Sequence, residues 1–124
     1  MRSYNQTIKL RASTQNLLSN IKYVQELAII TAVKHGIIFD LKANCYYLIK
    51  DGASPQLLEQ VKLGEVELKS VNFPLYNKSG FKGQAVIFKK LGNLDHGNGR
   101  IKLELNNKLK EIIFSSNAGE INIK

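Results

Sequence analysis

The side chains that could carry out catalysis or bind a metal are few in this chain of 124 residues. Its two histidines are His35 and His96, and its one cysteine is Cys45. A lone cysteine excludes an internal disulfide and a cysteine-based zinc site, and neither histidine has a second ligand at a zinc-binding spacing. We expect Cys45 to be a small buried residue in a strand and His35 to interact favourably with the dipole of a helix that ends there. The sequence predicts no catalytic residue, no metal site and no cofactor.

Asp95 and His96 are adjacent in the sequence and form the one acid and base pair worth considering. They lie in a segment rich in glycine and asparagine, Gly92 to Gly99, which joins two predicted strands. A phosphate-binding loop would instead lead into a helix and end in Gly-Lys-Ser/Thr, and a calcium loop would need two more carboxylates at set spacings. The segment therefore favours a tight turn over an acid and base site.

Basic residues outnumber acidic residues by 18 to 10, which gives a formal net charge of +8. This balance favours anionic partners such as nucleic acid or a cell-envelope polymer, but lysines scattered in this way are also typical of a solvated basic surface. If DNA is a partner, cationic side chains of the C-terminal half could align across strands as one basic stripe. The possible DNA-contacting residues are Lys82, Lys89, Lys90, Arg100, Lys102, Lys108 and Lys110. Tyr76 and Phe81 could stack on bases or pin their loop to the core.

The element that must organise these residues is a long helix predicted from Thr7 to Lys34 and ended by Gly36. Apolar and small side chains recur there at intervals of three and four, which places them on one face: Leu10, Thr14, Leu17, Ile21, Val24, Ala28 and Ala32. Such a stripe indicates an amphipathic helix that covers a sheet. From Leu27 to Val33 the helix is apolar nearly all round, so we expect its last turns to be buried and its first turns to project outward.

The rest of the chain is predicted to be mostly strands. A hairpin is predicted from Gly36–Leu41 and Asn44–Lys50. Apolar and charged residues alternate in Arg100–Leu105, as in an antiparallel strand with one buried and one solvent-exposed face. The other predicted strands are Glu65–Phe73, Gln84–Lys90, Leu109–Phe114 and Glu120–Lys124. Gln56–Leu63 could be a short helix or an irregular segment, and Pro74–Gly83 is predicted to be a loop.

These elements predict a single α+β domain, in which a long N-terminal α-helix (residues 1–35) packs on an antiparallel β-sheet in a β-rich head (residues 36–124). The length suits one domain with one core. No run of about 20 apolar residues occurs, so the 124 residues contain no predicted membrane span, and Met1 does not begin a signal peptide.

The order of these elements resembles the soluble part of type IV pilin-like proteins of the GspH/FimT class, and the lysine- and asparagine-rich composition is most similar to competence pseudopilins of the ComGD type. The helix pattern of that class is matched by Leu17, Ile21, Tyr23, Val24, Gln25, Ala28 and Ile29. Its C-terminal half is matched by Ala85–Phe88, Gly99–Leu103, and Gly119 with Ile121. The resemblance covers most of the chain, but it consists of loose hydrophobic patterns.

The resemblance implies a non-enzymatic minor pilin or pseudopilin, a structural subunit of a type IV pilus, competence or type II secretion-like filament at the cell surface. Its partners would be other pilin or pseudopilin subunits. The face expected to pack in the filament consists of Leu10, Leu17, Ile21, Val24 and Ala28. A membrane-embedded half-helix would precede residue 1, so the full-length precursor would be membrane-anchored.

Two other functions remain possible on the sequence alone. The first is a DNA-binding subunit for DNA uptake that uses a basic face of the sheet. Members of the FimT branch are associated with DNA capture through a C-terminal Gly-Arg-x-Arg, but the corresponding stretch of this chain is Gly119-Glu120-Ile121-Asn122 and has neither arginine. The second is a small hydrolase or ligand-binding domain, which would require a deep pocket lined by converging polar groups.

Overall fold

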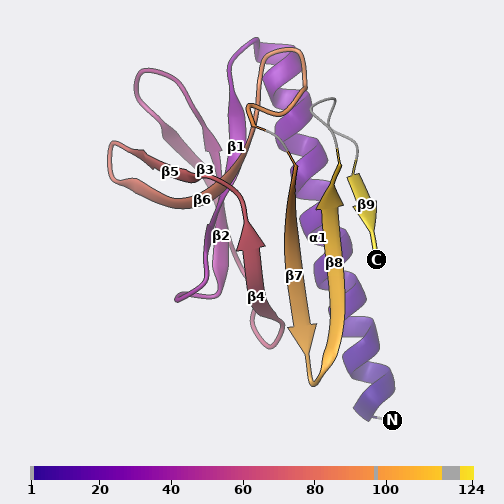
Figure 1. The fold of residues 1–124 in the computed structure, drawn as a ribbon. Coiled ribbons are helices and arrows are strands. Elements are labelled where there is room, and N and C mark those ends of the chain that lie inside the picture. Colours follow the sequence, from indigo (N-terminus) through magenta and orange to yellow (C-terminus); the bar gives the residue numbers. More distant parts are fainter. Residues whose placement is uncertain (1, 97, 116–120) are drawn as a thin grey trace.

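A computed structural model gives the arrangement of residues 2–96, 98–115 and 121–124 (Figure 1). The helix α1 spans Arg2–Thr31 and is followed by strands only. In chain order the strands are β1 (His35–Asp40), β2 (Cys45–Lys50), β3 (Gln56–Lys62), β4 (Glu67–Asn72), β5 (Leu75–Lys78), β6 (Phe81–Phe88), β7 (Gly99–Leu105), β8 (Lys108–Phe114) and β9 (Ile121–Ile123).

The strands form two antiparallel sheets. The first has the order β3-β2-β1-β6-β5, and the second has the order β4-β7-β8-β9. Helix α1 runs along one face of both sheets, and its N-terminal end extends beyond them (Figure 1). The predicted α+β architecture, with a long helix packed on antiparallel sheet, is confirmed.

The main core lies between α1 and the two sheets. The apolar stripe of α1 packs there against strand residues that alternate inward, such as Phe39 of β1 and Leu103 of β7. Leu17 and Ile21 have no exposed surface, and Tyr46 is also fully buried. Burying a large apolar side chain contributes roughly 1.5–3 kcal/mol, so this stripe fixes the helix on the sheets.

The end of α1 differs from the prediction. The helix ends at Thr31, and Ala32 takes a left-handed conformation with φ of 55°. The predicted helix stop, Gly36, lies inside β1, where a Cβ atom would collide with the carbonyl oxygen of Val86. Ala32 is therefore the C-terminal cap of the helix, and Gly36 has a different role: its missing side chain allows β1 and β6 to lie close together.

The predicted position of His35 at a helix end is also wrong, because it is the first residue of β1 and is 2% exposed. Its Nδ1 atom lies 2.7 Å from the carbonyl oxygen of Val33. A carbonyl only accepts hydrogen bonds, so this nitrogen must carry the proton. The imidazole is therefore a buried group of β1 that is bonded to the backbone of the connection before this strand.

Two segments predicted to lack strands contain them. Gln56–Lys62 is the edge strand β3, and the expected loop from Pro74 onward contains β5 and the start of β6, joined by a turn at Ser79 and Gly80. Both β3 and β5 are edge strands whose residues are mostly exposed on both faces. A strand without a buried face does not need to alternate apolar and polar residues, so the sequence carries no pattern that indicates these strands.

The last turns of α1 are not buried all round, contrary to the prediction. Ile29 is 51% exposed and Ile30 is 77% exposed, whereas the neighbouring Ala28 faces the core and is fully buried. None of the helices among the described residues is long and apolar enough to cross a membrane.

The prediction of a final strand at residues 120–124 is met by Ile121–Ile123, and Glu120 lies outside the described residues.

Candidate assembly surface

The face of α1 that the resemblance assigned to filament packing is covered by the domain itself. Leu17, Ile21, Val24 and Ala28 have no exposed surface, and Leu10 is 3% exposed. No side chain of another subunit can reach atoms that are already enclosed by the two sheets. The prediction that these five residues pack against other subunits is therefore wrong, and the stripe is the core-facing side of the helix.

The opposite face of α1 carries exposed apolar residues. Ile8, Tyr23 and Ile30 are 46%, 51% and 77% exposed. Because successive helical residues are about 100° apart, these three fall within roughly 60° of arc. Ala12 and Ser19 are exposed residues of the same arc, and their small side chains let another backbone approach closely. We call these five residues the free helix face.

A groove follows the N-terminal half of α1 beside this face. Its volume is about 290 Å³. It is bounded by the helix residues Lys9, Ala12 and Ser13 and by the β3–β4 connection at Leu63, Glu65 and Val66. The ammonium of Lys9 bridges the two sides through an ion pair with Glu65 at 3.0 Å. Because an exposed ion pair of this kind contributes at most about 1 kcal/mol, it presents only a small energetic barrier to a group that enters the groove.

The residues predicted to contact DNA do not form one stripe. Arg100 and Lys102 alternate with the buried residues of β7, so they lie on the face of the second sheet that points away from α1. Lys108 and Lys110 pair in register with the buried Leu105 and Leu103 and lie on the helix-facing side.

The contacts of these residues confirm the separation. The Nζ atom of Lys108 donates to the Oγ1 atom of Thr7 in α1 at 2.6 Å. On the outer face, Arg100 forms an ion pair with Glu111 at 3.3 Å, and Lys69 forms one with Glu104 at 3.5 Å. Carboxylates are thus interspersed with the cations, which lowers the positive potential of this face.

The remaining three cations are elsewhere. Lys82 belongs to the β5–β6 hairpin, and Lys89 and Lys90 follow the end of β6. The prediction of a single basic stripe is wrong, because cross-strand register puts its members on different surfaces. Of the two aromatic residues considered for base stacking, Tyr76 donates a hydrogen bond to Asp51, and Phe81 is partly buried against the outer face of the first sheet. Both hold the hairpin in place.

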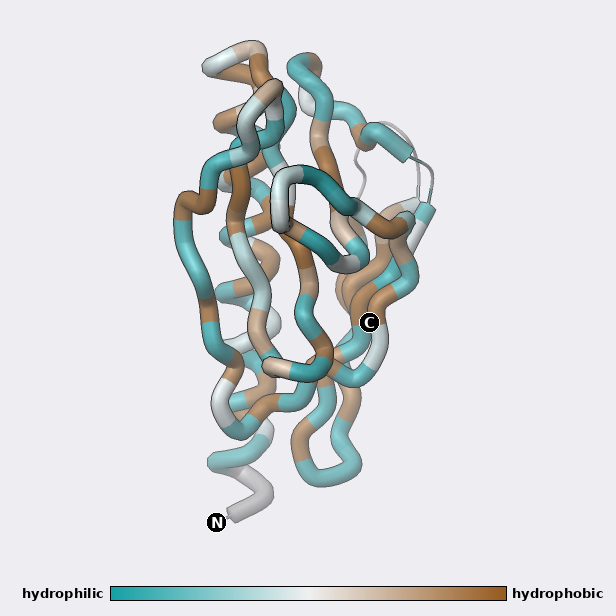
Figure 2. The backbone as a smooth tube through the Cα atoms, turned by 90° about the vertical axis from the view of Figure 1, so that its left-hand side faces the viewer, coloured by the Kyte–Doolittle hydropathy of each residue, from teal (hydrophilic) through white to brown (hydrophobic). Residues whose placement is uncertain are grey.

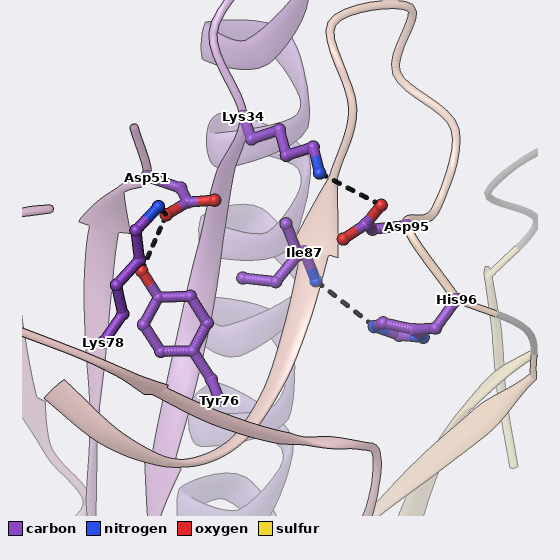
Figure 3. A network of polar contacts seen from close by, with 7 residues as sticks. All are labelled: Lys34, Asp51, Tyr76, Lys78, Ile87, Asp95 and His96. Atoms are coloured by element: carbon purple, nitrogen blue, oxygen red, sulfur yellow. Dashed lines mark hydrogen bonds and ion pairs between the residues drawn. The ribbon is translucent and has the colours of Figure 1, made fainter. Parts of the chain in front are cut away.

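Asp95 and His96 do not act as a pair (Figure 3). The carboxylate of Asp95 forms an ion pair with Lys34 at 3.2 Å, and the Nε2 atom of His96 accepts the N–H of Ile87 at 3.3 Å. The imidazole also lies against the ring of Phe73, with 5.2 Å between centroids. Each side chain fastens the connection after β6 to a different neighbour, as expected for a structural turn.

A polar cluster that the sequence did not reveal joins the β2–β3 connection to β5 (Figure 3). Tyr76 donates a hydrogen bond to the Oδ1 atom of Asp51 at 2.7 Å, and the ammonium of Lys78 lies 3.2 Å from the same oxygen. Partial burial raises the pKa of Asp51, but hydrogen bonds from Tyr76, Gly52 N–H and Lys78 together outweigh it and hold this pKa below its usual value. Burial and the Asp51 carboxylate raise the pKa of Tyr76.

The whole arrangement has counterparts among solved structures. Two structures of the minor pseudopilin EpsH from the type II secretion system of Vibrio cholerae superpose with TM-scores of 0.72 and 0.73 at 13% and 11% identity. Each comparison covers 94% of this chain and 96% or 95% of the other chain. The type IV minor pilin FimU of Pseudomonas aeruginosa superposes with a TM-score of 0.65 at 15% identity, over 98% of this chain and 92% of that chain.

The chain has a GspH/FimT-like pilin fold. No protein-family model and no curated protein matches its sequence, so the likeness lies in the fold. The predicted resemblance to this class is confirmed at that level. Gly119 and Glu120, which belong to the stretch that corresponds to the Gly-Arg-x-Arg motif of the FimT branch, lie outside the described residues.

Proposed function

We propose that this pilin-like domain is a minor pilin or pseudopilin, a non-enzymatic structural subunit of a type IV pilus, competence or type II secretion-like filament. The observation that carries the proposal is the free helix face, in which Ile8, Tyr23 and Ile30 are exposed on the side opposite the core. An apolar stripe along a helix of 30 residues, about 45 Å long, suits packing against helices of neighbouring subunits.

The position of α1 supports the same role. Its N-terminal end extends past both sheets (Figure 1), and the groove beside Ala12 and Ser13 offers space for a neighbouring helix. In the proposed assembly, an apolar segment preceding residue 1 anchors the precursor in the membrane, and the two sheets form the head displayed at the cell surface. The pilin-like fold of the EpsH and FimU structures is consistent with this arrangement.

Introducing positive charge on the free helix face tests the proposal. The double variant Tyr23→Lys and Ile30→Lys is made in the full-length gene product in its own cells, and filaments sheared from the cells are assayed for the subunit. We expect the subunit to be lost from the filament fraction while the purified domain keeps its circular dichroism spectrum. Leu109→Lys is the matched control, because Leu109 is 54% exposed on β8. Normal recovery of the double variant in filaments would contradict the proposal.

DNA binding is the second function to consider, and the net charge of +8 favours it. Phosphate contacts give an affinity that falls steeply with salt concentration. A gel-shift titration of the domain with duplex DNA at two salt concentrations tests this function directly. Because the seven predicted cations lie on different surfaces, we expect only weak, sequence-independent binding at low salt. The absence of any shift at low salt would remove DNA binding as a function.

A further inference from the structure

The first sheet has a second apolar layer on the face turned away from α1. Side chains of adjacent residues point to opposite faces of a strand, so Leu48 enters the main core and Ile49 enters this outer layer. The outer layer contains the buried residues Ile38, Ile49, Ala85 and Ile87, with Tyr47, Tyr76 and Phe81 packed against them. The β5–β6 hairpin curls out from the sheet on this side (Figures 1 and 2).

A groove lies between this hairpin and the edge strand β3. Its volume is about 310 Å³. Ile38, Tyr47, Leu57 and Phe81 provide apolar and aromatic surface, and Asp40, Gly80 and Lys82 complete the lining. Leu57 pairs in register with Ile49, which places it on the outer face, and its side chain is still 51% exposed. The outer layer is therefore incompletely covered at the point where β3 meets the groove.

Strand β3 itself is an open edge. It pairs with β2, no strand of residues 2–96, 98–115 or 121–124 lies on its other side, and all its residues except Val61 are exposed. In an antiparallel edge strand every second residue directs its N–H and C=O groups away from the sheet. The pairing of β3 with β2 shifts at Leu58, which has no partner in β2 and forms a bulge. Leu58 is 42% exposed. In Figure 2, β3 lies along the left-hand margin of the molecule, and the β5–β6 hairpin projects in front of the middle of the sheet.

The charges of the groove specify the polarity of an occupant. Asp40 already accepts a hydrogen bond from the N–H of Ala43 at 3.0 Å. Lys82 is exposed, and it has no ion pair with any residue in the described part of the chain. Asp40 and Lys82 thus line the groove without an ion pair between them, and an acidic group of an occupant could pair with the exposed Lys82 ammonium in a protein of net charge +8.

We propose that β3 and this groove bind an extended segment of a partner protein, which adds as a strand to β3, places an apolar or aromatic side chain in the groove and pairs an acidic residue with Lys82. Backbone hydrogen bonds to the open edge supply affinity, and the groove selects the alternate side chains. The surface lies on the other side of the first sheet from α1. It can therefore recruit a partner while the free helix face is occupied, which goes beyond a purely structural role.

The test is a titration of the nitrogen-15-labelled domain with the peptide acetyl-Thr-Phe-Thr-Val-Thr-Asp-amide, followed by NMR. We expect shifts of the amide signals of residues 56–62 and of Phe81. A peptide N-methylated at alternate residues cannot donate the strand hydrogen bonds, and a peptide with Lys in place of Asp cannot pair with Lys82. Both should bind at least about tenfold more weakly.

Variants of the domain provide the second half of the test. Leu57→Asp should weaken binding of the unmodified peptide by at least about tenfold, whereas Leu109→Asp, at an equally exposed leucine of the second sheet, should leave it unchanged. The proposal is overturned if millimolar peptide causes no shifts, or if N-methylation and Leu57→Asp have no effect. It is also overturned if the domain alone self-associates through β3, because a second copy would then be the occupant.

Discussion

Asn44 joins the two sheets, because its side-chain Oδ1 atom accepts a hydrogen bond from the N–H of Leu68 at 2.7 Å. The side-chain amide also donates to the carbonyl oxygen of Val66 at 2.9 Å. Asn44 precedes β2 of the first sheet, and Leu68 belongs to β4 of the second sheet. The backbone of Asn44 is left-handed, with φ of 55°, a conformation that asparagine adopts more readily than most residues. Asn44 thus stabilises the turn before β2 through its backbone conformation and connects the two sheets through its side chain.

Replacing Asn44 should therefore have two separable effects. Asn44→Ala loses the side-chain hydrogen bonds and strains the backbone, and we expect it to lower the free energy of unfolding by about 2–4 kcal/mol. Asn44→Gly loses the same bonds but adopts the left-handed conformation freely, so its cost should be smaller by about 1 kcal/mol. Urea unfolding of the two variants measures the difference. Equal stability of both variants would show that the backbone conformation contributes nothing.

The helix end offers a stabilising substitution. Ala32 has φ of 55° directly after α1, at the position where glycine is the preferred cap. We expect Ala32→Gly to raise the free energy of unfolding by about 0.5–1 kcal/mol, because relief of the strained φ exceeds the greater chain entropy of glycine. Ala12→Gly, at an exposed position inside the helix, should instead destabilise by about 1 kcal/mol. Thermal unfolding compares the two, and a lower melting temperature for Ala32→Gly would refute the cap assignment.

The sequence predicted those parts of the fold that have one buried face. The stripe from Leu10 to Ala28 predicted α1, and the alternation in Arg100–Leu105 predicted β7. The helix end was missed because its cap is an alanine, whose left-handed conformation no local pattern indicates. The edge strands β3 and β5 were missed because exposure on both faces removes the alternation.

The site was harder to predict than the fold. The sequence placed Val24 on a stripe that was assigned both to the sheet and to filament packing, and the placement of the sheets is what shows that Val24 is enclosed and Ile30 is exposed. Cross-strand register likewise separates Lys102 from Lys110, although both alternate along β-strands. The hydrogen bond between Asp51 and Tyr76 connects residues that are 25 positions apart, and no spacing in the sequence predicts it. These relationships depend on tertiary structure, which a local pattern does not contain.

The two faces of α1 should respond oppositely to truncation. Leu17→Ala removes a fully buried side chain, and we expect it to lower the free energy of unfolding by about 2–5 kcal/mol. Ile30→Ala removes a side chain that is 77% exposed, and we expect a change within about 0.5 kcal/mol. Chemical denaturation of the purified domain measures both. A cost above about 2 kcal/mol for Ile30→Ala would mean that the domain itself covers this residue, which would exclude it from an assembly surface.

The Asp51 cluster predicts how stability depends on pH. In the folded domain the pKa of Asp51 lies below its usual value of 3.8, because hydrogen bonds from Tyr76, Gly52 N–H and Lys78 outweigh the opposing effect of burial. The unfolded chain therefore binds a proton more readily at this group. The stabilisation is complete above the usual carboxyl pKa, and it is lost as the pH falls from there through the lower pKa of the folded state.

Asp51→Asn should remove this contribution, so the loss of stability of the variant on acidification below about pH 4 should be shallower than that of the parent. Tyr76→Phe, which deletes the shortest hydrogen bond to the carboxylate, should also make the acid dependence shallower because the pKa of Asp51 rises toward its usual value. Tyr23→Phe is the control, since Tyr23 is 51% exposed on the free helix face. Urea unfolding at a series of pH values supplies the curves. Parallel curves for Asp51→Asn and the parent would show that this carboxylate does not couple folding to pH.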